Sequence, residues 1–538
     1  MASPSSQRRI ARAVILLLAL PITLAAGAEL ALRAAYAWAA RSAESAPLLY
    51  ERVYWAVPPW VQNASIMYED PDLGLWMRRA SYRTYVNLYG PIGDLADVGR
   101  MFQSLFPDVP DWVRTRPVWH LRTNSMGLRG PELPATAAHD GYRVAVLGDS
   151  WTVGVNVEEQ ATYVARLAAA LSADAAPRQV EVLNFGVIGG RAESGARVLS
   201  RALALDPDLV ILAYAQNDEA DVRNGRSPVV PATAVRPAGA TSVVEDLELY
   251  RLWTWWKTSG EDRVDAMLRR ELTKERAVPE NHPGRPCPNA DVAATAYFAT
   301  MENTLARLQE AGVPTVLLYA SVPEFLSHCT LRALSALARA RDVPLVDASR
   351  VLEEAGEEMQ AEHDRSLGLE VPRGRRCAAR DVACVLLRVD MAGDTSGRQP
   401  FVMGNQPQLG SFRPNLTELY DDGSHGDQRA GDRVYSRTFA FAMPGVLTYA
   451  FTNGATPDTW TGLESYRLRA FDVSAADLGR LVAPPVAEFG RRVLRSDPSH
   501  PDEPGHQAIA DALVAVVREL PSFASFAGRG APNLPAPR

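Results

Sequence analysis

Between residues 142 and 347 the sequence alternates apolar runs with amphipathic segments, and this pattern constrains the fold more than any other feature. The first run, Val144–Leu147, is apolar throughout. Such runs are typical of strands buried on both faces of a parallel sheet. Strands are expected at 142–147, 179–183, 208–213, 313–320 and 343–347, with helices at about 160–172, 192–204, 296–311 and 330–341. The pattern predicts an α/β domain with a parallel, doubly wound, five-stranded sheet.

The composition narrows the class of protein. A hydrophobic content of 47% and a charged content of 22% are those of a globular chain. With 63 acidic and 56 basic residues the net charge is -7, which argues against a nucleic-acid partner. The 538 residues exceed one ordinary domain. Four cysteines without paired CxxC spacing argue against a disulfide scaffold and against a zinc site.

The N-terminus has the pattern of an export signal or a membrane anchor. Arg8, Arg9 and Arg12 precede an uninterrupted apolar run, Ala13–Ala28. Cleavage at the small residues Ala26–Ala28 is an alternative. We expect an uncleaved transmembrane helix within residues 1–40, because the alanine-rich pattern continues to residue 40. Arginines before the run place the body of the protein outside the cytoplasm.

The remaining segments divide the chain. Residues 41–140 are rich in Trp, Tyr and Pro and are expected to form an irregular layer ending in the stretch TNSMGLRGPEL. Short β-type runs between turn residues at 378–473 predict an inserted all-β sandwich. The α/β domain is then expected at 141–377, with a polar insertion at about 221–295, and again at 474–520, before a disordered tail at 521–538.

Three polar residues are candidates for nucleophilic catalysis. Ser150 follows the first strand in the stretch GDSW, at the sheet edge where α/β folds place their chemistry and near a helix N-terminus. A serine needs a base, and the base needs an acid that orients it. The stretch DPSH supplies Asp497 and His500 before the last helix. The alternatives are a turn that only ends a strand and an Asp-His turn that caps a helix, a role open to His506 as well.

Two further stretches offer hydrogen-bond donors for an oxyanion. NFGVIGG follows the second strand, and its glycines let a backbone N–H approach a substrate closely. AQND follows the third strand and provides the side-chain amide of Asn217. All these stretches fall after a strand or before the last helix, so we expect them at one edge of one sheet.

Together these stretches resemble the SGNH, or GDSL, hydrolase superfamily of serine esterases and lipases. The resemblance implies a three-layer α/β/α, flavodoxin-like fold, with Ser150 as nucleophile and Asp497 and His500 completing the triad. It implies an oxyanion hole from the N–H groups of Ser150 and Gly189 and the amide of Asn217. The third block reads AQND, with alanine where the family has glycine. The order Ser, Asp, His differs from the alginate-acetylating relatives, so transfer to alginate is not expected. TNSMGLRG is similar to the lead-in of exported bacterial members.

The inserted sandwich resembles starch-binding-type or related immunoglobulin-like carbohydrate modules. Phe412, Trp460 and Tyr466 are candidates for stacking on sugars, with the sandwich core as the alternative for Phe412 and Tyr466. The loop 421–432 gathers four carboxylates that suit calcium, although a solvated turn is the favoured interpretation. These are Asp421, Asp422, Asp427 and Asp432.

We therefore expect a serine ester hydrolase, anchored in a bacterial inner membrane with its body in the periplasm or outside the cell, or secreted if cleaved. It acts on O-acyl groups of a small molecule or a surface glycan through an acyl-enzyme, with no metal or cofactor. The alternatives are an O-acyltransferase and a glycan-binding protein with an idle site. In an oxidising compartment we expect the disulfides Cys377–Cys384 and Cys287–Cys329.

Overall fold

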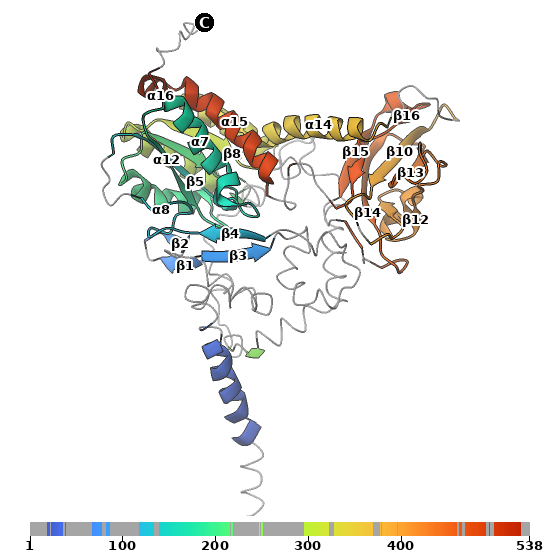
Figure 1. Cartoon of the computed structure of the whole chain (residues 1–538), viewed down its shortest axis with the longest axis horizontal. Helices are drawn as coiled ribbons and strands as arrows, with labels where there is room; N and C mark the ends of the chain where they lie inside the picture. The colour runs from blue at the N-terminus through green and yellow to red at the C-terminus, as the bar shows by residue number, and fades with distance from the viewer. Residues whose placement is uncertain are drawn as a thin grey trace, which may run out of the picture.

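The computed structural model describes residues 118–133, 139–215, 217–218, 295–321, 328–369, 377–490 (except 378, 395, 460–461 and 465–467), 494 and 500–528, with parts of 19–38, 67–86 and 247–250. Its centre is a five-stranded parallel sheet in the order β6-β5-β7-β8-β9 (Figure 1). The strands are β5 (Tyr142–Gly148), β6 (Val180–Gly186), β7 (Leu209–Ala213), β8 (Thr315–Tyr319) and β9 (Leu345–Asp347). This is the flavodoxin-like order, so the predicted sheet is confirmed.

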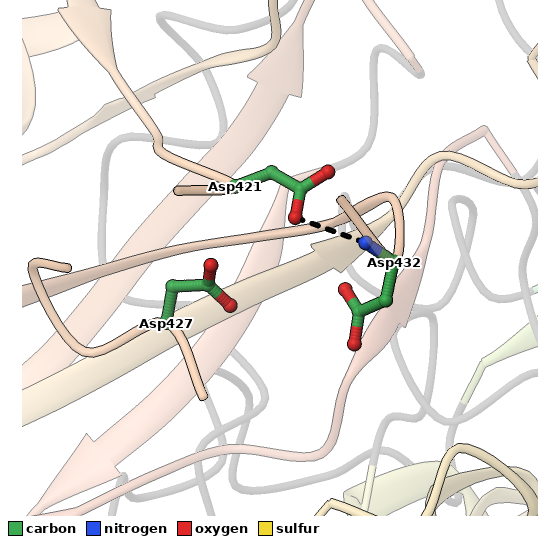
Figure 2. A group of neighbouring side chains, drawn as sticks. All are labelled: Asp421, Asp427 and Asp432. Atoms are coloured by element: carbon green, nitrogen blue, oxygen red, sulfur yellow. Dashed lines mark hydrogen bonds between the residues drawn. The ribbon is translucent and has the colours of Figure 1, made fainter. Parts of the chain in front are cut away.

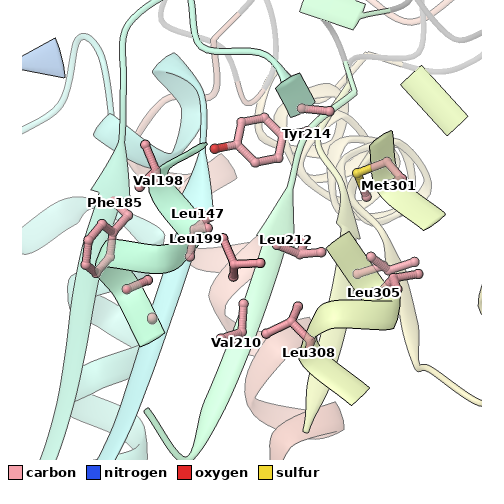
Figure 3. Packing of buried hydrophobic residues seen from close by; sticks show 14 of the residues in the cluster. Leu147, Phe185, Val198, Leu199, Val210, Leu212, Tyr214, Met301, Leu305 and Leu308 are labelled. Atoms are coloured by element: carbon pink, nitrogen blue, oxygen red, sulfur yellow. The ribbon is translucent and has the colours of Figure 1, made fainter. Parts of the chain in front are cut away.

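Helices cover both faces of this sheet, which is why its central strands are apolar throughout. On one face lie α8 (Ala192–Leu203), α12 (Ala296–Glu310) and α13 (His328–Ala340). On the other lie α7 (Tyr163–Ala175), α14 (Ala348–Ser366), α15 (Glu503–Glu519) and α16 (Pro521–Phe526). Figure 3 shows Leu199 and Leu305 packing from α8 and α12 against Val210 and Leu212 of β7. The two apolar layers fix the helices on the sheet.

The sheet register brings three strand ends side by side. Gly148, the last residue of β5, is aligned with Gly186 of β6 and with Ala213 of β7. The segments that follow these residues therefore leave the sheet at one edge. They contain the three stretches singled out above.

The N-terminal layer is more regular than expected. β1 (Met67–Asp70) pairs with β2 (Gly74–Met77), and β3 (Tyr82–Val86) pairs with β4 (Val118–Arg122), both antiparallel. Because β3 and β4 are far apart in the sequence, no short hairpin signal marks them. β2 lies against α8, and β4 lies against the short turn Glu159–Ala161 that precedes α7.

The insertion forms two four-stranded sheets around their own apolar core. One sheet contains β10 (Ala383–Asp390), β13 (Val434–Phe441), β16 (Leu481–Val482) and β17 (Ala487–Glu488). The other contains β11 (Phe401–Gly404), β12 (Thr417–Glu418), β14 (Gly445–Thr452) and β15 (Arg469–Val473). The sandwich extends to Glu488, past the expected boundary at 473, because strands of two residues leave no periodic pattern.

Three other expectations concern the C-terminal tail, the disulfides and the N-terminal anchor. The tail expected to be disordered from 521 begins with α16, whose Phe523 is fully buried. Cys377 and Cys384 form a disulfide, as expected, whereas the second pairing involves residue 287, outside the described residues. Among the described residues, no helix is long and apolar enough to cross a bilayer. Much of the expected anchor, including residues 1–18, lies outside them.

Candidate active site

Ser150 and His500 meet at the carboxyl edge of the sheet. Ser150 is the first residue of the one-turn helix α6 (Ser150–Val153), and His500 lies in the loop before α15. The Nε2 atom of His500 is 2.9 Å from the Oγ atom of Ser150. Ser150 is 9% exposed, so the residue is largely buried but still in contact with solvent. This is the hydrogen bond that a serine nucleophile requires from its base.

Asp149 shapes the turn that presents Ser150. Its Oδ1 accepts the N–H of Trp151 at 2.9 Å, which makes it the N-cap of α6. Burial raises the pKa of Asp149 to about 7, opposed by the N–H of Trp151 and the positive field of His500. Asp149, which is 1% exposed, thus accepts hydrogen bonds at the turn that presents Ser150, without a direct ion pair to a described residue.

The loop after β6 lies against the same turn. The N–H of Val187 donates to the carbonyl of Gly148 at 3.0 Å. A Cβ atom on Gly190 would lie 3.2 Å from that carbonyl oxygen, so a side chain there would crowd the turn that presents Ser150. Gly189 has a φ of +72°, a backbone conformation that favours glycine. The predicted oxyanion residue therefore stands in the loop that packs against the Ser150 turn.

Asn217 joins the three loops. Its Nδ2 donates to the carbonyl of Gly190 at 2.9 Å and to Oδ2 of Asp149 at 3.3 Å. Both hydrogens of the amide are thus engaged within the site. The neighbouring Asp218 accepts the N–H of Ala192 at 3.2 Å, at the start of α8. The AQND stretch therefore ties the loops after β5 and β6 to the end of β7.

Two residues of this site were not predicted from the sequence. Asn184 donates through Nδ2 to the carbonyl of Thr152 at 2.6 Å and accepts the N–H of Gly186 at 2.9 Å. Arg129 donates to the carbonyl groups of Val153 and Gly154, at the end of α6. Both lie within stretches singled out above, NFGVIGG and TNSMGLRG, so the motifs were visible although the contacts were not.

Residues 146–367 match the model of the GDSL-like lipase and acylhydrolase family. The matched range contains Ser150, Gly189 and Asn217 and stops before His500. The chain carries a domain of this family. It is therefore an ester-hydrolysing enzyme of the SGNH, or GDSL, type.

Several solved structures of SGNH-type and related esterases are similar to part of the chain. The SGNH-hydrolase family esterase AlinE4 is 17% identical, covering 39% of this chain and 77% of its own, with a TM-score of 0.22. TesA is 14% identical, covering 40% and 81%, with a TM-score of 0.23. The acetyl xylan esterase AlAXEase is 14% identical, covering 41% and 84%, with a TM-score of 0.23. No curated protein sequence matches the chain.

Two other residues were predicted near Ser150 and His500, Asp497 as the acid of the triad and His506 as a possible helix cap. Asp497, the predicted acid of the triad, lies outside the described residues and stays a prediction. His506 does not cap α15, because Asp502 does so by accepting the N–H of Gly505 at 2.9 Å. His506 is instead fully buried, and its Nδ1 accepts the N–H of Tyr163 at 3.2 Å.

The aromatic residues proposed for sugar binding are only partly described. Phe412 is 6% exposed and packs with Met403, Ala450 and Leu463 in the sandwich. Its ring is therefore not available for stacking on a sugar, and the core alternative holds. Trp460 and Tyr466 lie outside the described residues.

The carboxylates proposed for calcium gather only in part. Asp421, Asp427 and Asp432 each bring an oxygen within 4.8 Å of the others (Figure 2). Asp422 does not join them and accepts instead from the N–H of Ser424 at 2.8 Å. Backbone N–H groups already bond to the three clustered carboxylates, as in the bond from Asp432 to Oδ1 of Asp421. Hard oxygen donors of this kind suit calcium, but a solvated turn stays the favoured interpretation of this loop.

Proposed function

We propose that Ser150 is the nucleophile of this ester hydrolase and that His500 is its general base. The observation that carries the proposal is the 2.9 Å separation between Oγ of Ser150 and Nε2 of His500. His500 takes the hydroxyl proton as Ser150 attacks the ester carbonyl, and returns it to the leaving alkoxide. Water then attacks the acyl-enzyme by the same route. Asp497 orients the imidazole in this scheme.

The oxyanion is held by donors around the nucleophile turn. The N–H of Ser150 belongs to the first residue of α6, where helix N–H groups favour negative charge. The N–H of Gly189 and the amide of Asn217 complete the set. Because both hydrogens of that amide are engaged, Asn217 donates to the oxyanion in place of its longer bond to Asp149.

Replacement of the nucleophile tests the mechanism. In Ser150→Ala, turnover of p-nitrophenyl acetate should fall by about 10⁶, since the acyl-enzyme can no longer form. A fluorophosphonate probe should label Ser150 in the native protein and nothing in the variant. Ser321→Ala is the matched control: this buried serine follows β8 at the same sheet edge, and its hydroxyl has no hydrogen-bond partner in the described structure. Near-normal turnover by Ser150→Ala would refute the mechanism.

The substrate that we propose is an O-acyl group on a surface or extracellular glycan, cleaved by an enzyme tethered through its N-terminal segment. The apolar run behind three arginines supports the tether. The sandwich supports the glycan, because a module that holds a polymer beside the serine raises the local concentration of acyl groups. α14 leads from the α/β domain directly into this sandwich (Figure 1).

Trp460 is the residue on which the glycan proposal can be tested. Trp460→Ala should lower the release of acetate from an acetylated polysaccharide severalfold and leave the turnover of p-nitrophenyl acetate unchanged. Phe412→Leu is the control for a merely destabilised sandwich, since that ring belongs to its core. Equal losses on both substrates would identify a structural tryptophan instead.

A further inference from the structure

Arg129 is a buried cation that contacts the backbone of the nucleophile segment. It is 3% exposed. Its Nη1 donates to the carbonyl oxygens of Val153 at 2.7 Å and Gly154 at 2.6 Å, and its Nη2 to those of Val157 at 2.7 Å and His120 at 2.9 Å. Three of these four acceptors lie three to seven residues after Ser150 in the chain. A guanidinium is suited to this because it presents several donors in one rigid plane.

The two carbonyls bound by Nη1 belong to peptide groups that also hold the nucleophile. The N–H of Gly154 donates to the carbonyl of Ser150 at 3.0 Å, and the N–H of Val155 donates to it at 3.2 Å. Each of these N–H groups shares a rigid peptide plane with a carbonyl that Arg129 binds. By fixing the two planes, Arg129 fixes the donors that hold the Ser150 carbonyl.

The peptide plane between Ser150 and Trp151 is thereby held along both edges. Its carbonyl accepts the two N–H groups just described, and its N–H donates to Asp149 at 2.9 Å. The orientation of this plane sets the backbone of Ser150 and hence where its Oγ lies relative to His500. A chain of contacts thus leads from the guanidinium to the reacting atom.

The stretch TNSMGLRG is organised to present Arg129. Asn124, which is 4% exposed, accepts the N–H of Leu128 at 3.0 Å and donates to the carbonyl of Pro131 at 3.0 Å. Gly127 has a φ of +82°, and a Cβ atom there would lie 2.5 Å from the carbonyl oxygen of Met77. This turn is folded on itself and pressed against β2. Arg129 leaves it beside the sheet, in a backbone bridge with Asn184.

We infer that Arg129 is a positioning residue, which acts through the backbone of α6 to hold Ser150 in register with His500. The inference rests on the proposed function of Ser150. It assigns a role to a residue outside the matched range 146–367. Burial lowers the pKa of Arg129 to about 10, so the side chain remains a cation at neutral pH. The N-terminal layer thus supplies a part of the catalytic site.

The test compares Arg129→Lys with Arg143→Lys. Arg143 is a matched buried arginine, 2% exposed, that binds Glu181 at the opposite end of β5. Lysine keeps the charge but cannot bond to four carbonyls, so Ser150 should shift. A displacement of this kind costs up to about 10² in rate. We expect the maximal rate of fluorophosphonate labelling to fall 10- to 100-fold in Arg129→Lys, with the half-saturating concentration unchanged, and Arg143→Lys to label at the native rate per folded molecule.

A second variant distinguishes a loss of positioning from misfolding. In Arg129→Ala, millimolar guanidinium chloride should restore labelling at least tenfold, whereas sodium chloride at equal ionic strength should not. Folded fractions are measured by circular dichroism in every sample. The inference would be overturned if folded Arg129→Lys were labelled at a rate within twofold of native. Equal losses in both lysine variants, or no rescue of Arg129→Ala by guanidinium, would also overturn it. Absence of Ser150 labelling in the native protein would instead overturn the proposed function.

Discussion

His506 places a titratable ring inside the apolar core beneath the active site. Its Nδ1 accepts the N–H of Tyr163, so the proton of the neutral ring is on Nε2, which has no partner among the described residues. Burial, helped by the positive field of Arg129, lowers the pKa of His506 to about 3. Between that value and the ordinary 6.5, the unfolded chain binds one more proton than the folded one. Stability is therefore lost as the pH falls through this window.

The variant His506→Gln should remove this acid sensitivity, because glutamine can still accept the N–H of Tyr163 but does not titrate. Relative to the variant, the native free energy of unfolding should fall by about 3 kcal/mol between pH 6.5 and pH 4. Urea unfolding of both proteins at these two pH values measures the difference. Carboxyl groups, including Asp149 with its raised pKa, titrate in both proteins, so their contributions cancel in the difference. A parallel decline in the two proteins would show that His506 is not responsible.

At the residue scale, the sequence predicts the proposed catalytic groups better than the residues that hold them in place. Ser150 and His500 stand in stretches whose residue types are themselves the signal, and the structure brings them to 2.9 Å. Arg129 and Asn184 act by donating to carbonyls of residues 152–157. Every residue has a carbonyl, so such a contact leaves no mark on the acceptor sequence. The motif can be seen, but its partner cannot.

At the element scale, strand β5 could be predicted from the sequence, whereas helix α6, which follows it, could not. β5 is predictable because four consecutive apolar residues need burial on both faces. α6 has one turn, too short for a periodic pattern or for stability by itself. Asp149 caps its start, and Asn184 and Arg129 bind carbonyls at its end. The same limit applies to β12, β16 and β17, whose two-residue lengths depend on pairing with longer strands.

At the scale of the whole molecule, two apolar cores are joined by mainly polar contacts. The described core residues of the α/β domain and of the sandwich belong to separate clusters. Helix α14 links the two cores. Its Leu352 packs in the α/β core. Further along the helix, Gln360 donates to the carbonyl of Val486 at 2.8 Å, and Asp364 accepts the N–H of Val486 at 3.2 Å. Each core is able to hold its own unit together, so we expect two cooperative unfolding transitions in calorimetry.

Replacing Arg388 should shift the midpoint of the sandwich's unfolding transition without shifting that of the α/β domain. It lies on β10 and is 2% exposed, and none of its three guanidinium nitrogens has a hydrogen-bond partner in the described part of the chain. Burial lowers its pKa, and the carboxylate of Asp364 offsets this only in part. A buried charge without a bonded partner is costly, so an unbranched apolar side chain of similar length should be more stable there.

Arg388→Met should therefore stabilise the sandwich by about 1–3 kcal/mol. The midpoint of its transition should rise by about 4–8 °C for each kcal/mol, while the α/β transition and the turnover of p-nitrophenyl acetate stay unchanged. Arg437→Met on the neighbouring strand β13 is the control, because that guanidinium donates to the carbonyl of Glu418 at 3.0 Å and stacks on Phe439. Its replacement should not stabilise. A lower sandwich midpoint in Arg388→Met would mean that the guanidinium binds an anion, and a shift of both transitions would mean that the two cores unfold as one.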